Sequence, residues 1–417
     1  MGKRILFAGI TLLLLCSWAL AAEEIKVGSI NDLTGATSDV GKDAALGVRE
    51  SVAYVNDNGG INGKKIKLIL YDYGYRVPEA ITRYKQFKDY DKINILLQWG
   101  TGDTEALSPT VNKDKMVTIS DSLSGHLCDP KKTPYNFIYS TDYSTNARAC
   151  LQTWYDEVWK KSDKWKAARE AGKKPKLSCF YMFAAPYSSA PIKAIKDHAK
   201  LLGIEVGEDQ DVSLTALDAK SQVLAAKRDN PNVIWHGNTT MSVATTIKDA
   251  YALGLGVDHI MNNWAFDTNL LKMTGKAGEG AMGAAACAFF DEDVPMLKEV
   301  REYAKKINPG VAENKRTIRA VQGWLKVSMA VGALKAADKK GKLDGPSLRA
   351  TLETFKDWSP FDKPNAFGRP PYTITDKDHR PSSVSMVYQI KDGKIQLMQK
   401  VDMKAKFPDK WDSWLGW

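Results

Sequence analysis

The stretch that decides the fold runs from residue 25 to residue 73 and reads IKVGSINDLTGATSDVGKDAALGVRESVAYVNDNGGINGKKIKLILYDY. It opens with the apolar run Ile25–Ile30 and closes with the alternating segment Lys65–Tyr71, so both ends predict strands. Between them, apolar residues recur at spacings of three and four, and Asn58-Gly59-Gly60 supplies a helix stop. The stretch therefore predicts a strand–helix–strand unit with parallel strands. Its first loop lies at the carboxyl end of a strand, where open α/β sheets bind ligands.

The same rhythm continues along the chain and restarts after residue 143. Buried or alternating runs predict further strands at 93–98, 116–119, 177–183, 205–212, 233–236 and 259–262. Helical patterns separate them, at 78–90, 105–113, 145–162, 191–202, 219–227 and 243–253. The last third contains a long apolar helix, 321–337, and a hairpin of strands 383–390 and 394–398 around Lys391-Asp392-Gly393. Two successive doubly wound α/β halves are the predicted architecture.

The opening unit also carries a family resemblance. A strand followed by D-L-T-G and a helix ending in VNDNGGINGKKIKLILYD resembles type I periplasmic solute-binding proteins of the branched-chain amino acid (Leu/Ile/Val) class, which serve ABC transporters. The resemblance extends from about Ile25 to Gln399. It implies two Rossmann-like lobes joined by a three-segment hinge, with crossings near 139–143, 284–290 and 360–371. The lobes are then expected to comprise residues 23–141 plus 288–365, and residues 142–287 plus 366–417.

Size and composition fit an exported globular protein. The chain has 417 residues, of which 44% are apolar and 26% charged, enough for two domains with sizeable cores. Residues 1–22 place Lys3 and Arg4 before the apolar run Ile5–Leu15 and small residues at 19–21, which predicts a secretory signal peptide and a periplasmic location. The net charge of +10 is spread along helices. Even the basic segment 160–176 is best interpreted as a solvated helix and loop, so no nucleic-acid partner is expected.

The cysteines and the motif inventory argue against metal sites and catalysis. Cys128 and Cys150 are close enough in sequence, near the predicted cleft, for a disulfide in an oxidising compartment, and the sequence leaves that pairing open. Cys179 and Cys287 lie in apolar runs and are expected to be buried thiols. No CxxC or histidine spacing suggests a metal. A nucleophile elbow and a complete dinucleotide fingerprint are both missing, so neither a cofactor nor an enzyme activity is expected.

The resemblance implies which residues of the first lobe meet the solute. Thr104 would come from the loop WGTGDT, and Ser122, Leu123 and Ser124 from the next strand end. Hydroxyls with nearby N–H groups suit an anionic oxygen, although serine also caps helices and turns everywhere. Asp103 has the wrong sign for a carboxylate ligand and is expected to cap the helix that starts beside it.

In the second lobe, Tyr187 matches the aromatic that family members place after that lobe's first full strand, and it would close over the ligand. Asn238 and Thr239 occupy another strand end. The sequence departs from the amino acid binders after strand 259–262, where Trp264 stands in place of the acid that holds a ligand ammonium, followed by Phe266. Because an unpaired buried charge costs several kcal/mol, the departure favours a carboxylate with an apolar or aromatic body over a zwitterion. Three further aromatic residues are candidates for the lining, although core or rim positions suit them as well: Tyr75, Trp99 and Tyr143.

The expected function is therefore solute capture by hinge closure. A monomer would deliver a small carboxylate-bearing, amino acid-like ligand to the membrane permease of an ABC importer. The alternative is a sensory role, in which the same fold presents its ligand to a receptor or regulator. The sequence does not separate the two, because both use the closed form.

Overall fold

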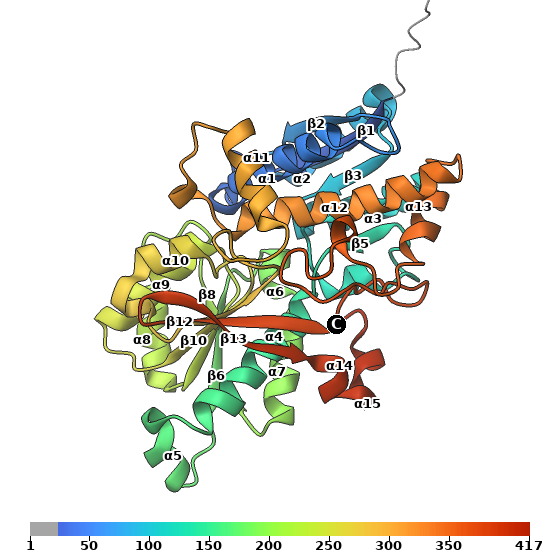
Figure 1. The fold of residues 1–417 in the computed structure, drawn as a ribbon. Helices are drawn as coiled ribbons and strands as arrows, with labels where there is room; N and C mark the ends of the chain where they lie inside the picture. The colour runs from blue at the N-terminus through green and yellow to red at the C-terminus, as the bar shows by residue number, and fades with distance from the viewer. Residues whose placement is uncertain (1–23) are drawn as a thin grey trace, which may run out of the picture.

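The protein is described by a computed structural model that covers residues 24–417 (Figure 1). Its first sheet has five strands, all parallel, and each is a short buried or half-buried run from the first part of the chain. In spatial order they are β2 (Ile66–Asp72), β1 (Ile25–Asn31), β3 (Ile95–Gln98), β4 (Thr118–Ser120) and β5 (Asn136–Ile138). The predicted opening unit is present, with Ile25 beside Ile66 in the β1–β2 register.

The second sheet is mixed and contains eight strands. Its order is β13 (Lys394–Asp402), β12 (Val384–Lys391), β11 (Met282–Ala285), β10 (Asp258–Met261), β9 (Val233–His236), β6 (Lys176–Tyr181) and β7 (Glu205–Val206), with β8 (Gln210–Asp211) also paired to β6. The C-terminal hairpin is antiparallel to β11, and the remaining pairs are parallel. The predicted strand 205–212 is thus two short strands, because regular pairing with β6 is interrupted at residues 207–209, where the Gly207 amide still donates to Leu177.

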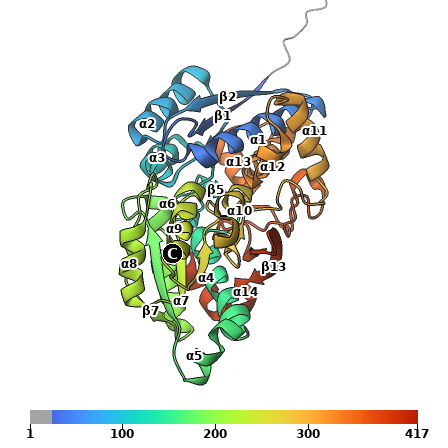
Figure 2. The ribbon, with the colours of Figure 1, turned by 90° about the vertical axis from the view of Figure 1, so that its left-hand side faces the viewer.

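Helices cover both sheets (Figures 1 and 2). Those of the upper lobe in Figure 1 are α1 (Ser38–Asp57), α2 (Val77–Gln86), α3 (Thr101–Asp114), α11 (Leu297–Ile307), α12 (Ile318–Lys339) and α13 (Gly345–Leu352). Those of the lower lobe are α4 (Tyr143–Thr153), α5 (Lys166–Glu170), α6 (Pro186–Ser189), α7 (Ile192–Leu201), α8 (Lys220–Asp229), α9 (Thr240–Ala252), α10 (Thr268–Thr274), α14 (Met403–Lys406) and α15 (Pro408–Trp411).

Two glycines let α1 and α12 pack at unusually short range. A Cβ atom on Gly47 would lie 2.0 Å from the carbonyl oxygen of Ala320, and one on Gly323 would lie 2.4 Å from that of Ala44. Real Cβ atoms do not approach backbone so closely, so larger residues would push the helices apart. This contact fixes the first turn of α12 beside the lobe boundary, where it supplies Arg319 to the site described below.

The chain passes between the two sheets at residues 139–142, 286–296 and 353–383, and each passage overlaps a predicted crossing. One residue, Arg369, ties the passages together. Its guanidinium donates to the hydroxyls of Ser140 and Thr141 and to the carbonyls of Ala286 and Val384, at 2.7–3.1 Å. The predicted two-lobed fold with a three-segment hinge is confirmed. The exact division of residues between lobes stays a prediction.

Two helix ends and one cysteine pair differ from the sequence expectations or decide what the sequence left open. Helices 78–90 and 145–162 end in π-helical turns, Phe87–Asp91 and Trp154–Trp159, instead of running on as α-helix. Cys128 and Cys150 do not form a disulfide: all four cysteines of residues 24–417 are free and buried, and these two thiols donate to different carbonyls, of Ser124 and Met261.

The predicted signal peptide lies outside the described residues. From residue 24 onward, no helix has the length and hydropathy needed to cross a bilayer.

Candidate functional site

A small cavity lies where the carboxyl ends of the two sheets face each other. It encloses about 250 Å³ of space free of protein atoms, counted to its open side. Its lining comes from the loops that follow strands β1, β2, β3, β5, β6, β9 and β10: Thr37, Val40, Tyr75, Trp99, Gly100, Thr101, Tyr143, Tyr187, Thr239 and Trp264. Five of these residues are aromatic, and none is charged. Only about 20 Å³ of that space can hold the centre of a water-sized sphere, which is room for about one water molecule, so the lining residues pack closely on one another.

Three helices begin at this cavity. Thr37, Gly100 and Thr239 are the N-cap residues of α1, α3 and α9, and all three line the space. The first backbone N–H groups of a helix have no partner inside it and carry the positive end of the helix dipole. Hydroxyls stand beside them, and two, on Tyr187 and Thr239, are buried without a hydrogen bond of ordinary geometry. The arrangement offers directed donors to an anionic oxygen.

The aromatic residues are held rigidly. The indole N–H of Trp264 donates to the Tyr143 hydroxyl at 2.6 Å, and that hydroxyl lies 3.2 Å from the carbonyl oxygen of Asp121. The rings of Trp99 and Trp264 have centroids 5.2 Å apart, and the indole N–H of Trp99 donates to Thr37 at 3.0 Å. Trp264 thus bridges the lobes, since it follows β10 of the second sheet and contacts residues anchored on the first. The cavity wall is preorganised instead of being shaped by loose side chains.

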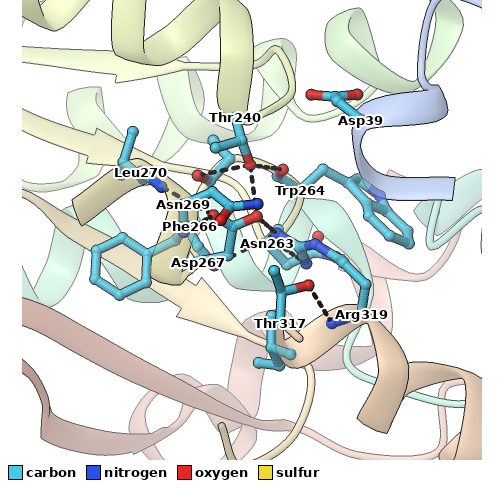
Figure 3. A network of polar contacts seen from close by, with 12 residues as sticks. Asp39, Thr240, Asn263, Trp264, Phe266, Asp267, Asn269, Leu270, Thr317 and Arg319 are labelled. Atoms are coloured by element: carbon cyan, nitrogen blue, oxygen red, sulfur yellow. Dashed lines mark hydrogen bonds and ion pairs between the residues drawn. The ribbon is translucent and has the colours of Figure 1, made fainter. Parts of the chain in front are cut away.

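Behind Trp264 lies a polar network that fixes its loop (Figure 3). Arg319, from the first turn of α12, donates to the carbonyl of Asn263 at 2.5 Å and lies 3.4 Å from the Asp267 carboxylate. Its guanidinium stands 5.2 Å from the centroid of the Trp264 ring. The Asp267 carboxylate also caps α10 and accepts a 2.7 Å hydrogen bond from Thr240. An interlobe cation thereby holds the 262–267 loop, and Asp267 is committed to this network.

The acids nearest the cavity are also occupied. Asp103 accepts a 2.8 Å hydrogen bond from the Tyr73 hydroxyl, and burial raises the pKa of its carboxyl to about 7. Asp121 pairs with Lys326 inside the first lobe; burial raises the pKa of Asp121, with the lysine charge as the largest opposing effect. Asp39 lies just behind Thr239 and accepts the amide of Met241 across the lobe boundary at 3.3 Å. Loss of hydration around the Asp39 carboxylate raises its pKa as well, although the residue itself is exposed.

Comparison with known proteins identifies the family. Residues 24–394 match the family model described as "Periplasmic binding protein". This chain belongs to the periplasmic binding protein family. A Leu/Ile/Val-binding protein of Escherichia coli (strain K12) is 22% identical over 336 residues, which cover 77% of this chain and 83% of that protein.

Solved structures agree on the fold. A branched-chain amino acid ABC transporter protein from Thermus thermophilus with bound valine superposes with a TM-score of 0.83 at 20% identity, covering 94% of this chain and 100% of that one. A solute-binding protein from Rhodopseudomonas palustris BisB5 in complex with 3,4-dihydroxybenzoic acid gives 0.73 at 20% identity, covering 91% and 97%. The resemblance read from the opening unit is confirmed. Periplasmic binding proteins bind solutes and are not enzymes, which agrees with the interpretation of the motifs.

The structure of this periplasmic binding protein brings together three of the predicted contact residues. Tyr187, Thr239 and Trp264 line the cavity, as do the further aromatic candidates Tyr75, Trp99 and Tyr143. Ser122 does not line the cavity itself but contacts a residue that does, because its hydroxyl lies 2.7 Å from the hydroxyl of Thr101.

The remaining predicted residues lie outside the lining. Leu123 is core, and its carbonyl accepts the amide of Tyr143, while the Ser124 hydroxyl is buried elsewhere without a partner. The side-chain amide of Asn238 makes all its hydrogen bonds within the protein. Its oxygen accepts from the Met182 amide and the Ser188 hydroxyl, and its nitrogen donates to the Val212 carbonyl and the Ser242 hydroxyl. Phe266 packs in the core against Phe289.

Thr104 is displaced because its helix starts earlier than predicted. α3 begins at Thr101 instead of residue 105, so the Thr104 hydroxyl bonds back to the carbonyl of Gly100 within the first turn. Asp103 is then the third helical residue and not the cap, and its carboxylate accepts the amide of Gly100. Gly100 and Thr101 therefore take the lining position that the sequence assigned to Thr104.

Thr37, Val40 and Arg319 were missed as site residues. The signal for the first two was present, because the loop after the first strand was already expected to meet a ligand. Arg319 carried no local signal, since only the packing of α12 on α1 brings it to the second lobe.

Proposed function

We propose that this periplasmic binding protein captures a small aromatic carboxylate between its lobes and delivers it to the membrane permease of an ABC importer. The observation that carries the proposal is the composition of the cavity: aromatic walls and helix N-termini, with no charged side chain in the lining. A carboxylate gains directed N–H and O–H donors there, and a flat apolar body gains the Trp99, Tyr187 and Trp264 rings. Export to the periplasm and action as a monomer belong to the same proposal.

An ammonium group would fare worse in this cavity. Asp103, Asp121 and Asp267 are each engaged by other groups, and Asp39 accepts the Met241 amide from outside the lining. Trp264 occupies the position from which amino acid binders present an acid. A buried cation without a partner costs several kcal/mol. Support also comes from the Rhodopseudomonas palustris relative, which was solved with a hydroxylated benzoic acid. The Thermus thermophilus relative, solved with valine, makes amino acids the necessary comparison.

The test compares matched pairs that differ only in the amine: 3-phenylpropionate against phenylalanine, and 4-methylpentanoate against leucine. Benzoate and 4-hydroxybenzoate complete the acids, and benzamide controls for the carboxylate. Thermal shift gives the first screen, because a ligand at a hundredfold its Kd adds about 2.7 kcal/mol of stability. Titration calorimetry then gives each Kd.

We expect each amine-free acid to bind at least about tenfold more tightly than its amino acid partner, a difference of 1.4 kcal/mol. Benzamide should bind more weakly than benzoate. Tighter binding of leucine or phenylalanine than of its amine-free partner would refute the proposed ligand class while leaving the family assignment intact.

A further inference from the structure

A second, wider pocket adjoins the cavity. It measures about 890 Å³ counted to its open side and opens between the lobes. The first lobe contributes Ala36, Tyr75, Val77, Gly102 and Asp103, and the second contributes Met182, Ala184, Ala185, Pro186, Ser213, Leu214 and Thr215. Most of its surface is apolar, and Asp103 is the charged residue in it.

The wall between the two spaces is one residue thick. At three places consecutive residues face opposite sides: Thr37, Thr101 and Tyr187 line the inner cavity, while the neighbouring Ala36, Gly102 and Pro186 line the outer pocket. Tyr75 lines both. Its side chain is therefore the part of the wall that a substitution can remove without breaking the backbone.

The backbone holds Tyr75 in place. It follows β2 in the left-handed region, with φ of +56° after Gly74 at +58°, which is a costly conformation for a bulky residue. Its ring lies on the start of α3, where a Cβ atom on Gly100 would come within 2.7 Å of it. Such strain persists only where the surroundings fix the conformation, so the ring position is set by the fold.

We propose that Tyr75 sets the upper limit on ligand length by closing the inner cavity against the outer pocket. The proposal rests on the inner cavity being the solute site of the proposed function. Removing the ring would join the two spaces and admit ligands that extend away from the carboxylate. Because the outer pocket is largely apolar and carries Asp103, it would take neutral alkyl or aryl extensions and disfavour a second carboxylate.

The experiment uses the wild-type protein, Tyr75→Gly and Tyr75→Phe. Glycine suits a positive φ and removes the ring, whereas phenylalanine keeps the ring and loses only the hydroxyl. Calorimetry measures binding of two series of increasing length: benzoate, 4-ethylbenzoate and 4-butylbenzoate; and the amino acids 2-aminobutanoate, 2-aminohexanoate and 2-aminooctanoate. Terephthalate tests the effect of a second carboxylate, and a thermal melt of each variant checks folding.

Whichever of the two series wild type binds, we expect Tyr75→Gly to bind the longest member of that series at least ten times more tightly than wild type does. Tyr75→Phe should keep the wild-type length limit, and terephthalate should gain nothing from Tyr75→Gly. A gain confined to the amino acids would support the role of Tyr75 while refuting the aromatic carboxylate as ligand. If folded Tyr75→Gly gains no long ligand in either series, including when neither series binds, the role of Tyr75 is overturned.

Discussion

Arg369 is the residue whose loss tests the hinge most directly. It lies in the third passage, is 4% exposed, and donates four hydrogen bonds of 2.7–3.1 Å that join this passage to the other two and to the start of β12. Hydrogen bonds from a charged donor contribute about 1.5–3 kcal/mol each. Their sum overstates the effect, because a buried guanidinium has a desolvation cost and because Ser140 and Thr141 also donate to the Ala286 and Val384 carbonyls. We expect Arg369→Met to lower the free energy of unfolding by roughly 2–4 kcal/mol.

Calorimetric melting of Arg369→Met, Arg369→Lys and wild type measures the effect. At about 1–2 °C per kcal/mol for a chain of this length, the methionine variant should melt roughly 2–8 °C lower. Lysine should recover only a part, because one ammonium cannot reproduce the planar fork that spans the passages. Arg228→Met, at an exposed position of α8, is the matched control and should melt within about 1 °C of wild type. An Arg369→Met protein that melts with the control would refute the assignment of Arg369 as the tie between the passages.

Four further substitutions test the site and its support. Trp264→Ala should weaken benzoate binding by about tenfold or more in calorimetry, whereas Trp417→Ala, at a residue 58% exposed, should not. If Trp264→Ala binds benzoate as tightly as wild type does, the ligand site has been assigned to the wrong place. Lys326→Met should lower the free energy of unfolding, measured in urea, by about 3–5 kcal/mol because it leaves the buried Asp121 carboxylate without its cation. Adding Asp121→Asn should recover part of that loss, and a double variant as unstable as Lys326→Met would contradict the pairing. His259 is buried beside His236, and burial lowers the pKa of His259 to about 4. As the pH drops from about 6.5 to 4, this histidine takes up its proton in the unfolded chain first, so the free energy of unfolding should fall by at most about 3 kcal/mol. If His259→Asn shows the same dependence of stability on pH, this histidine is not the cause. Asp39→Asn keeps an acceptor for the Met241 amide and should change benzoate affinity by less than about threefold, so a larger loss would show that the carboxylate charge itself supports the site.

The parts of the fold that could be predicted are those encoded locally. The first strand, helix and strand follow from a periodicity and a glycine stop within one window, and β9 matches its predicted range, Val233–His236. The start of α3 could not be predicted, since Gly100 caps that helix through a contact with Asp103 and presents no side-chain signal. A shift of four residues was enough to move Thr104 from the lining into the helix.

The candidate site shows the same division. Trp264 and Tyr187 were found through the family resemblance, which places ligand-contacting residues directly after these two strands, and strand ends converge in a doubly wound sheet. Asn238 also follows a strand, but its four hydrogen bonds to the protein leave the adjoining Thr239 to face the cavity. Arg319 and Arg369 depend on contacts more than 50 residues away along the chain, as Arg319 to Asn263 illustrates, and no sequence window contains that information.

The distribution of charge around the cavity argues for an anionic solute more strongly than any single residue does. Asp121 is neutralised by Lys326, and Asp267 by Arg319, so the acids that surround the cavity on two sides add little repulsion. The helix N-termini face the cavity without a charged side chain in the lining, although Asp39 already accepts the Met241 amide at the start of α9 and Asp103 accepts the Gly100 amide at the start of α3. Asp39 and Asp103 have no such cation in hydrogen-bond contact, and loss of hydration raises the pKa of both carboxyls. An entering carboxylate would raise the pKa of Asp39 further, whereas an ammonium would lower it. Proton uptake on binding, measured by calorimetry in buffers of different ionisation enthalpy, therefore distinguishes the two ligand classes by its sign.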